Sequence, residues 1–206
     1  ACIDLQSGET KWTQQDDVAK GAQVVVADGD KVFMAYRKKL AVYRAADGEK
    51  AWETKLPYRA YRKALYVVGD VVFPGATGSP NAVAVGYDVS TGEKVKEIKA
   101  KNLTSPEHHH RCYRNKATSR YIIASMEGAE FLAIDDAEHS QNNWVRGACK
   151  YGMMPANGLL YAPPDQCFCS PGAMLRGFAA LAPAASSPGV PVADEKRLAR
   201  GAAWGT

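Results

Sequence analysis

Short runs of valine, alanine and aromatic residues alternate with glycine- and aspartate-rich turns along the first hundred residues of the chain. Residues 23–27 and 31–36 are two such runs, and the Asp-Gly-Asp between them favours a tight hairpin. Residues 40–43 and 51–56 supply a second pair of runs around another turn. Because no stretch sustains the 3.6-residue apolar period of an amphipathic helix, the pattern predicts one four-stranded antiparallel unit here.

The same order of runs returns further along, so the whole chain is predicted to be all-β. A Gly/Pro-rich insertion at 74–80 interrupts the second unit, and a polar connection at 101–107 precedes the third. The predicted strands of these two units are 64–68, 71–73, 82–87, 95–98, 111–114, 121–125, 131–135 and 144–147. A fourth unit is predicted to begin with residues 149–152 and 158–161.

One turn phrase recurs at residues 4–12, 46–52 and 88–94, and its glycines stand 40 and 44 residues apart. A period near 40 residues is typical of β-propeller blades or solenoid units. The pattern therefore predicts a β-propeller of four-stranded antiparallel blades, with room for about four to five blades in this chain. Closed propellers have about four to eight blades, and the sequence begins and ends inside a unit, so we expect an incomplete ring that belongs to a longer protein.

Each residue type in the turn phrase has a physical role. The glycines can take the positive φ that closes a tight turn, and the Ser, Asp or Thr before each glycine can bond to the turn backbone. A tryptophan four residues after the glycine can cover the gap to a neighbouring blade. Lys96 replaces it in the third copy, and a fourth copy is expected at residues 135–144. The residues assigned to this structural repeat are Asp4, Gly8, Trp12, Gly48, Trp52, Asp88, Gly92, Asp135 and Trp144.

Composition and charge narrow the classes of partner. A net charge of +4 with 23% charged residues is ordinary for a globular protein, and no apolar stretch approaches the roughly 18 residues of a membrane span. Residues 58–63 mix tyrosine with cations, as a nucleic-acid-binding strand would, but a solvated loop between blades is the favoured interpretation. Neither a nucleic-acid partner nor a transmembrane segment is predicted.

The domain boundary is predicted from a change in composition. Residues 1–182 carry the blade pattern, and beyond Leu181 proline, alanine and serine dominate. Residues 183–206 are therefore expected to be a linker and the start of a further segment.

The turn phrase, with its aspartate, Thr-Gly and a tryptophan eight residues after the aspartate, resembles the pyrroloquinoline-quinone-like repeat of quinoprotein-type propellers. The second half resembles a narrower bacterial group, labelled pyrroloquinoline-quinone-binding-like or similar to the outer-membrane assembly lipoprotein propeller. The segments that carry this resemblance are 110–118, 143–152 and 155–161, followed by Cys167-Phe-Cys169. Asp165 stands where that group commonly has a histidine after the Pro-Pro pair.

This resemblance implies an exported, multi-bladed protein of the periplasm or cell envelope. The leading hypothesis is a non-catalytic binding or scaffolding module that takes a protein segment or a small ligand at the propeller mouth, or pairs with a partner through exposed strand edges. The alternative is a quinone-dependent alcohol or sugar dehydrogenase, in which pyrroloquinoline quinone and calcium would occupy a site completed by blades outside this sequence. The vicinal cysteine pair expected of such dehydrogenases is not matched, because Phe168 separates Cys167 from Cys169. No nucleophile-elbow, phosphate-loop or paired-carboxylate spacing occurs, so no catalytic residue is predicted.

The cysteines of the second half admit two interpretations. In an exported protein they form one or two disulfides between adjacent blades, each worth about 2–4 kcal/mol. Alternatively, with the histidines at 108–110 they form a metal or haem site, although no zinc-knuckle or haem-attachment spacing is present. This alternative cluster consists of His110, Cys112, Cys149, Cys167 and Cys169. Cys2 lies apart from them, and its partner is either outside this sequence or absent.

Three arginines are candidate anion ligands, because a guanidinium can bind a carboxylate through two parallel hydrogen bonds. They are Arg111, Arg114 and Arg146. Ion pairs with blade aspartates such as Asp135 are the simpler interpretation. Asn157, which precedes a glycine, is expected in a hairpin turn or, at a propeller mouth, as a ligand-binding residue.

Overall fold

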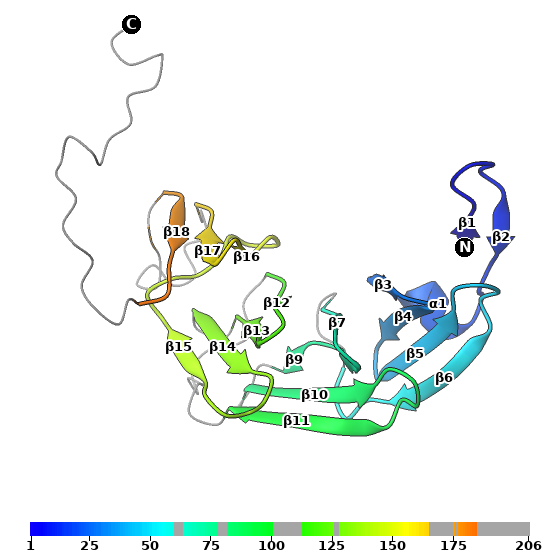
Figure 1. Ribbon diagram of the computed structural model, residues 1–206, viewed down its shortest axis with the longest axis horizontal. Helices are drawn as coiled ribbons and strands as arrows, with labels where there is room; N and C mark the ends of the chain where they lie inside the picture. Colours follow the sequence, from blue (N-terminus) through cyan, green and yellow to red (C-terminus); the bar gives the residue numbers. More distant parts are fainter. Residues whose placement is uncertain are drawn as a thin grey trace, which may run out of the picture.

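The computed structural model of the protein describes residues 1–59, 64–77, 82–100, 113–125, 128–164, 175 and 177–184. Figure 1 shows these residues as an open arc of small antiparallel sheets that follow one another in chain order. The predicted all-β architecture with four-stranded antiparallel blades in an incomplete ring is confirmed. In each blade the first strand lies on the concave side of the arc and the last on the convex side (Figure 1).

Blade 1 is the most regular unit. Its strands are β3 (Val25–Asp28), β4 (Lys31–Tyr36), β5 (Lys39–Arg44) and β6 (Lys50–Lys55), hydrogen-bonded in that order. The Asp-Gly-Asp hairpin closes where the sequence predicts it, with Gly29 at φ +55°. Short β-rich runs bounded by glycine turns therefore sufficed to place this blade, and its central strands β4 and β5 are continuous buried runs because both of their faces are covered.

Blade 2 repeats the arrangement with one addition. Its strands are β7 (Tyr66–Val68), β8 (Val71–Phe73), β10 (Ala82–Asp88) and β11 (Lys94–Ala100), as the sequence predicts. A short strand β9 (Ala76–Thr77) from the Gly/Pro-rich insertion pairs with β10 as well.

Blade 3 differs from the prediction at both ends. Its strands are β12 (Lys116–Ala117), β13 (Tyr121–Ala124), β14 (Ala129–Ala133) and β15 (Ser140–Asn142). The predicted closing strand at 144–147 is wrong, because the chain turns back early enough for Ser140 to pair with Phe131.

The predicted first strands of blades 3 and 4 were also displaced. Of the predicted strand 111–114, residues 111 and 112 lie outside the described residues, and Tyr113 forms an isolated bridge with Lys150. In the predicted strand 149–152 the chain turns, and the Gly152 N–H donates to the Ala148 carbonyl at 2.8 Å. Blade 4 instead consists of β16 (Met154–Ala156), β17 (Leu159–Ala162) and β18 (Ala179–Leu181). Glycine explains part of this shift, since Gly152 takes φ +76° and turns the chain before β16.

The N-terminal segment forms a hairpin and the one helix of the described residues. The hairpin pairs β1 (Cys2–Ile3) with β2 (Thr10–Trp12). It leads into α1 (Asp17–Gly21), a five-residue helix that the sequence analysis did not predict. The carboxylate of Asp16 caps this helix by accepting from the Ala19 N–H at 2.9 Å.

The hydrophobic core lies in the seams between successive blades. One face of each sheet packs on the next sheet, so successive blades share their buried side chains. The seam between blades 1 and 2 buries Phe33, Leu40, Val42, Val72, Val85 and Tyr87. The seam between blades 2 and 3 buries Phe73, Ala84, Ile98, Ile122, Ala124 and Leu132, and the next one buries Tyr113, Ile123, Ala129, Met153, Leu160 and Ala162.

The turn phrase ties neighbouring blades together through its tryptophan. The ring of Trp12 lies over Gly48 of the next blade, and its Nε1 donates to the Ala45 carbonyl at 2.9 Å. Trp52 lies over Gly92 in the same way. A methyl group on either glycine would come within 2.6 Å of the indole ring. Each tryptophan therefore acts as a clasp that requires glycine beneath it.

The seam between blades 2 and 3 has no such clasp, because Lys96 occupies the tryptophan position. A cavity of about 270 Å³ opens there, lined by Lys96, Ser119, Arg120, Tyr121, Ala133, Ile134, Asp135, Ala137 and Glu138. Instead, the Lys99 N–H donates across the seam to Asp136 Oδ1 at 3.1 Å. The ring of His139 lies 3.0 Å from the same oxygen and orients it.

Candidate functional site

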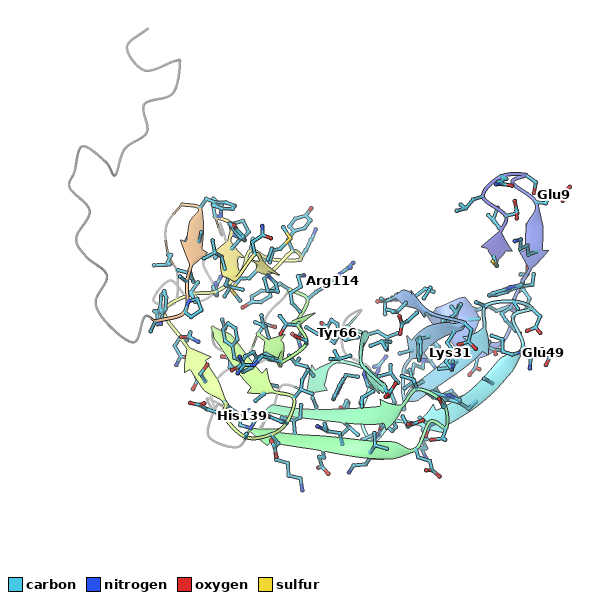
Figure 2. The ribbon with its side chains drawn as sticks, viewed as in Figure 1. Glu9, Lys31, Glu49, Tyr66, Arg114 and His139 are labelled. Carbon is cyan, nitrogen blue, oxygen red and sulfur yellow. The ribbon has the colours of Figure 1, made fainter. Side chains whose placement is uncertain are left out.

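The concave side of the arc brings together polar residues at the start of two inner strands. Tyr66 begins β7, and Arg114 and Asn115 directly precede Lys116, the first residue of β12. Figure 2 shows Tyr66 and Arg114 near each other on this side, with the Arg114 side chain extending toward the open centre of the arc. We call Tyr66, Arg114, Asn115 and Lys116 the inner-rim site.

Tyr66 contributes a buried hydroxyl that has no hydrogen-bond partner within the described residues. Its ring packs against the cluster that contains Phe73 and Ile122, so the hydroxyl lies in the seam between blades 2 and 3. Burial raises the pKa of Tyr66 well above its usual value, against the opposing charge of Arg114, so the group keeps its proton and can donate. An unpaired buried polar group of this kind costs about 1–3 kcal/mol.

Asn115 contributes a second unpaired donor. The residue is 2% exposed, and its Oδ1 accepts from the Ser125 hydroxyl at 3.1 Å. Its Nδ2 has no partner in the part of the chain that the structure describes. Asn115 directly follows Arg114 and precedes Lys116, the first residue of β12, and its partner Ser125 directly follows β13. Its amide therefore lies at the inner rim of blade 3, next to Arg114.

Two cations complete the inner-rim site. Arg114 is exposed, whereas Lys116 is partly buried and donates through Nζ to the Tyr151 carbonyl at 3.0 Å. Burial lowers the pKa of Lys116, and the neighbouring Arg114 lowers it further. Neither cation forms a salt bridge with a carboxylate in the part of the chain that the structure describes. The site therefore offers hydrogen-bond donors and positive charge, which suits an anion.

Acidic and basic residues are concentrated in the connections at opposite ends of the blades. In an antiparallel blade the first and third turns meet at one end, which we call the turn face, and the other connections meet at the opposite end, which we call the mouth face. The described turn-face connections carry one cation, Arg120, and the acids Asp4, Glu9, Asp30, Asp47, Glu49, Asp70, Glu93, Asp135, Asp136 and Glu138. The described mouth-face connections carry Lys20, Arg37, Lys38, Arg59, Arg114, Arg146 and Lys150.

Two acids occur in the described connection between β2 and β3. Asp17 forms a salt bridge of 2.9 Å with Lys39 at the mouth-face end of β5. Asp16 forms one of 2.9 Å with Lys50, which directly follows the turn at residues 45–49, so its carboxylate lies toward the turn face. At the turn face, Lys11, Lys31 and Arg44 likewise pair with Asp4, Asp30, Asp47 and Glu49. The described connections of the mouth face still carry an excess of cations and those of the turn face an excess of acids, and the inner-rim site lies at the basic end.

The structure separates the residues that the sequence proposed as ligands. Arg114 lies in the inner-rim site, Arg146 is 4% exposed in the connection after β15, and Arg111 lies outside the described residues. Asn157, at φ +51°, occupies an exposed tight turn at the turn face. Asp135 caps its own turn by accepting from the Ala137 N–H at 3.2 Å.

Sequence reasoning missed Tyr66, Asn115 and Lys116. Their place at the start of inner strands was the available signal, but their unpaired atoms depend on packing between blades.

The repeat residues have defined places in the turns. The three glycines take φ values of +74°, +76° and +75°, and Asp4 and Asp88 accept backbone N–H groups within their own turns. Lys11 and turn N–H groups lower the pKa of Asp4 to about 2. Trp144 lies in the turn after β15 and is 52% exposed, unlike the two clasping tryptophans.

The cysteine predictions are not resolved. Cys149 is partly buried, Cys2 lies in β1, and the other members of the predicted cluster lie outside the described residues. Within the described residues, no three His, Cys, Asp or Glu side chains form a group that could hold a metal ion. The disulfides, the metal cluster and the calcium of the dehydrogenase alternative therefore stay predictions.

A family model described as outer membrane protein assembly factor BamB matches residues 1–107, more than half of the 206 residues. The chain belongs to this BamB family. The predicted resemblance to propellers with quinoprotein-like repeats is confirmed with it. No protein of curated function matches the chain. No helix in the described parts of this BamB-family chain is long and apolar enough to cross a membrane.

Solved structures agree on the fold. BamB from Moraxella catarrhalis has 14% identity and a TM-score of 0.52 over 74% of this chain and 46% of its own, so the present chain spans less than half of that protein. The computationally designed Ika4 protein has 8% identity and a TM-score of 0.54 over 76% of this chain and 92% of its own. Quinohemoprotein alcohol dehydrogenase ADHIIG from Pseudomonas putida HK5 reaches 12% identity and a TM-score of 0.45 over 68% and 32%, too low to carry an inference.

Proposed function

We propose that this BamB-family protein is a non-catalytic binding module of the bacterial cell envelope that holds an acidic segment of a partner protein at its mouth face. The observation that carries the proposal is the division of charge, with cations on the mouth face and acids on the turn face. The family description, an assembly factor of outer membrane proteins, supports a protein partner and an envelope location.

Charge of this kind acts on both the rate and the orientation of binding. A basic face attracts an acidic segment over distances near the Debye length, about 8–10 Å at physiological salt. The acidic turn face repels the same segment, so docking is directed to the mouth.

The test compares two peptides that differ only in charge. A fluorescein-labelled 15-residue peptide rich in Asp and Glu, and its counterpart with Asn and Gln, are titrated with the 206-residue chain by fluorescence anisotropy. We expect the acidic peptide to bind at least about tenfold more tightly and to weaken as salt rises. The double variant Lys38→Glu/Arg59→Glu should weaken binding, whereas Arg120→Glu on the turn face should not. Equal binding of the two peptides would refute the proposal.

The quinone-dependent dehydrogenase remains the alternative hypothesis. Pyrroloquinoline quinone and calcium are added to the full-length parent protein, and dye-linked oxidation of alcohols and sugars is followed. Tight quinone binding with turnover would overturn the non-catalytic proposal.

A further inference from the structure

We infer that the inner-rim site is a carboxylate seat, in which Arg114, Tyr66 and Asn115 together hold one carboxylate of the acidic segment. The inference rests on the proposed function, because it names the group that the mouth face recognises. The carboxylate belongs either to an aspartate or glutamate side chain or to the C-terminus of the partner.

The first support is a pair of unsatisfied polar atoms at the inner rim of blades 2 and 3. Proteins pair most buried polar groups, so the Tyr66 hydroxyl and the Asn115 Nδ2, both without a partner among the described residues, require an explanation. The Ser125 hydroxyl bonds to Oδ1 of Asn115, which leaves Nδ2 as the side that can donate to a ligand. A bound carboxylate oxygen would accept from both groups.

The second support is the neighbouring guanidinium. Arg114 lies near enough for its charge to act on Tyr66, and its side chain extends toward the open centre of the arc (Figure 2). A guanidinium can bind both oxygens of a carboxylate in its plane, while the neutral donors bind from the seam side.

The charge count favours a singly charged carboxylate over a phosphate. Lys116 already donates to the Tyr151 carbonyl, so Arg114 is the exposed cation of the site. One guanidinium balances one carboxylate charge, whereas a phosphate monoester carries about −1.5 to −2 at neutral pH.

Sodium acetate is the first probe, because it carries the carboxylate and little else. The ¹⁵N-labelled full chain is titrated at constant ionic strength, and the side-chain Nδ2 protons of Asn115 and the Nε proton of Arg114 are followed by NMR. We expect a saturable downfield shift of both signals with acetate and none with chloride. Absence of a saturable shift, or tighter saturation by methyl phosphate, would overturn the carboxylate seat.

Variants separate recognition from stability. Arg114→Gln should lower the acetate affinity about tenfold, the loss expected for one charge-assisted contact. Tyr66→Phe should lower the affinity while leaving the melting temperature unchanged or higher, because it removes an unpaired buried hydroxyl. Tyr58→Phe is the matched control: the Tyr58 hydroxyl accepts from the Val85 N–H at 3.1 Å, so its loss should lower the melting temperature without changing the affinity. An unchanged affinity in both Arg114→Gln and Tyr66→Phe would refute the assignment.

Experiments with peptides identify the source of the carboxylate and distinguish a failure of the carboxylate seat from a failure of the proposed function. Acidic peptides with a free or an amidated C-terminus are compared, and loss of binding on amidation assigns the seat to a chain end. Salt-dependent binding of acidic peptides that Arg114→Gln and Tyr66→Phe leave unchanged would overturn the seat but not the proposed function. Acetate binding without any preference for acidic peptides would overturn the proposed function but not the seat.

Discussion

The tryptophan clasp predicts that two glycines in similar backbone conformations have different tolerance to alanine. Gly92 takes φ +75° beneath Trp52, and an added methyl group would come within 2.6 Å of the ring. Gly69 takes φ +56°, and a methyl group there would meet nothing within 4 Å. Both substitutions carry the cost of a left-handed alanine, about 1 kcal/mol. Gly92→Ala also forces the indole aside, and such overpacking costs about 1–3 kcal/mol more.

Urea unfolding followed by far-ultraviolet circular dichroism measures the difference. We expect Gly69→Ala to lower the free energy of unfolding by about 1 kcal/mol and Gly92→Ala by about 2–4 kcal/mol. In a Trp52→Leu background the additional cost of Gly92→Ala should fall to about 1 kcal/mol, because the clash is gone. If Gly92→Ala costs no more than Gly69→Ala in the parent chain, the clasp does not stabilise the seam and the reasoning is wrong.

Three further predictions concern the helix cap, the third turn and the cysteines. Partial burial of the Asp16 carboxylate disfavours its charged form and acts to raise its pKa. The hydrogen bonds that it accepts from the Ala19 N–H, the Lys50 ammonium and the Tyr43 hydroxyl have the larger effect and lower the pKa to about 2. Because the pKa is lower in the folded state, the ionised carboxylate stabilises the fold above pH 3.8, and this stability is lost as the pH falls toward 2. Asp16→Asn should therefore flatten the fall in urea midpoint between pH 4 and pH 2. An unchanged pH profile would contradict this prediction. His139 Nδ1 accepts from the Ala133 N–H at 3.0 Å, so His139→Ala should cost about 1 kcal/mol in urea unfolding, and a cost near zero would argue against that bond. Mass spectrometry of unreduced peptides should show Cys149 joined to Cys112, Cys167 or Cys169 if the predicted disulfide forms, and finding it as a thiol would remove that prediction.

The seam between blades 2 and 3 shows how far a decaying repeat can depart from the pattern of the earlier copies. Lys96 stands where Trp12 and Trp52 stand in the earlier copies, and the space it leaves is the cavity of about 270 Å³. In place of the indole hydrogen bond, the Lys99 N–H donates across the seam to Asp136, beside the buried cluster that contains Phe73 and Ile122. We expect the arc to open first at this seam, since the indole ring and its hydrogen bond are missing there.

Local pattern determined most of blades 1 and 2. Alternating apolar runs and glycine turns act over a few residues, so the strands around Gly29, Gly48 and Gly92 could be placed without knowledge of the tertiary structure. The phrase period also predicted the arc of blades, because each blade is one such unit and buries its faces on its neighbours. The spacing also predicted that the tryptophans cover the gap to a neighbouring blade, and the structure shows that they do so by lying over Gly48 and Gly92.

Tertiary packing decided the remainder. The closing strand of blade 3 and the first strands of blades 3 and 4 lie elsewhere than their apolar runs suggested, because pairing partners and the turn at Gly152 set their bounds. The inner-rim site depends on residues 66 and 114–116, which are far apart in sequence and meet only when two sheets pack. Whether a buried hydroxyl or amide finds a partner is a property of that seam and not of any local pattern, so only the tertiary structure could identify Tyr66 and Asn115 as unpaired donors.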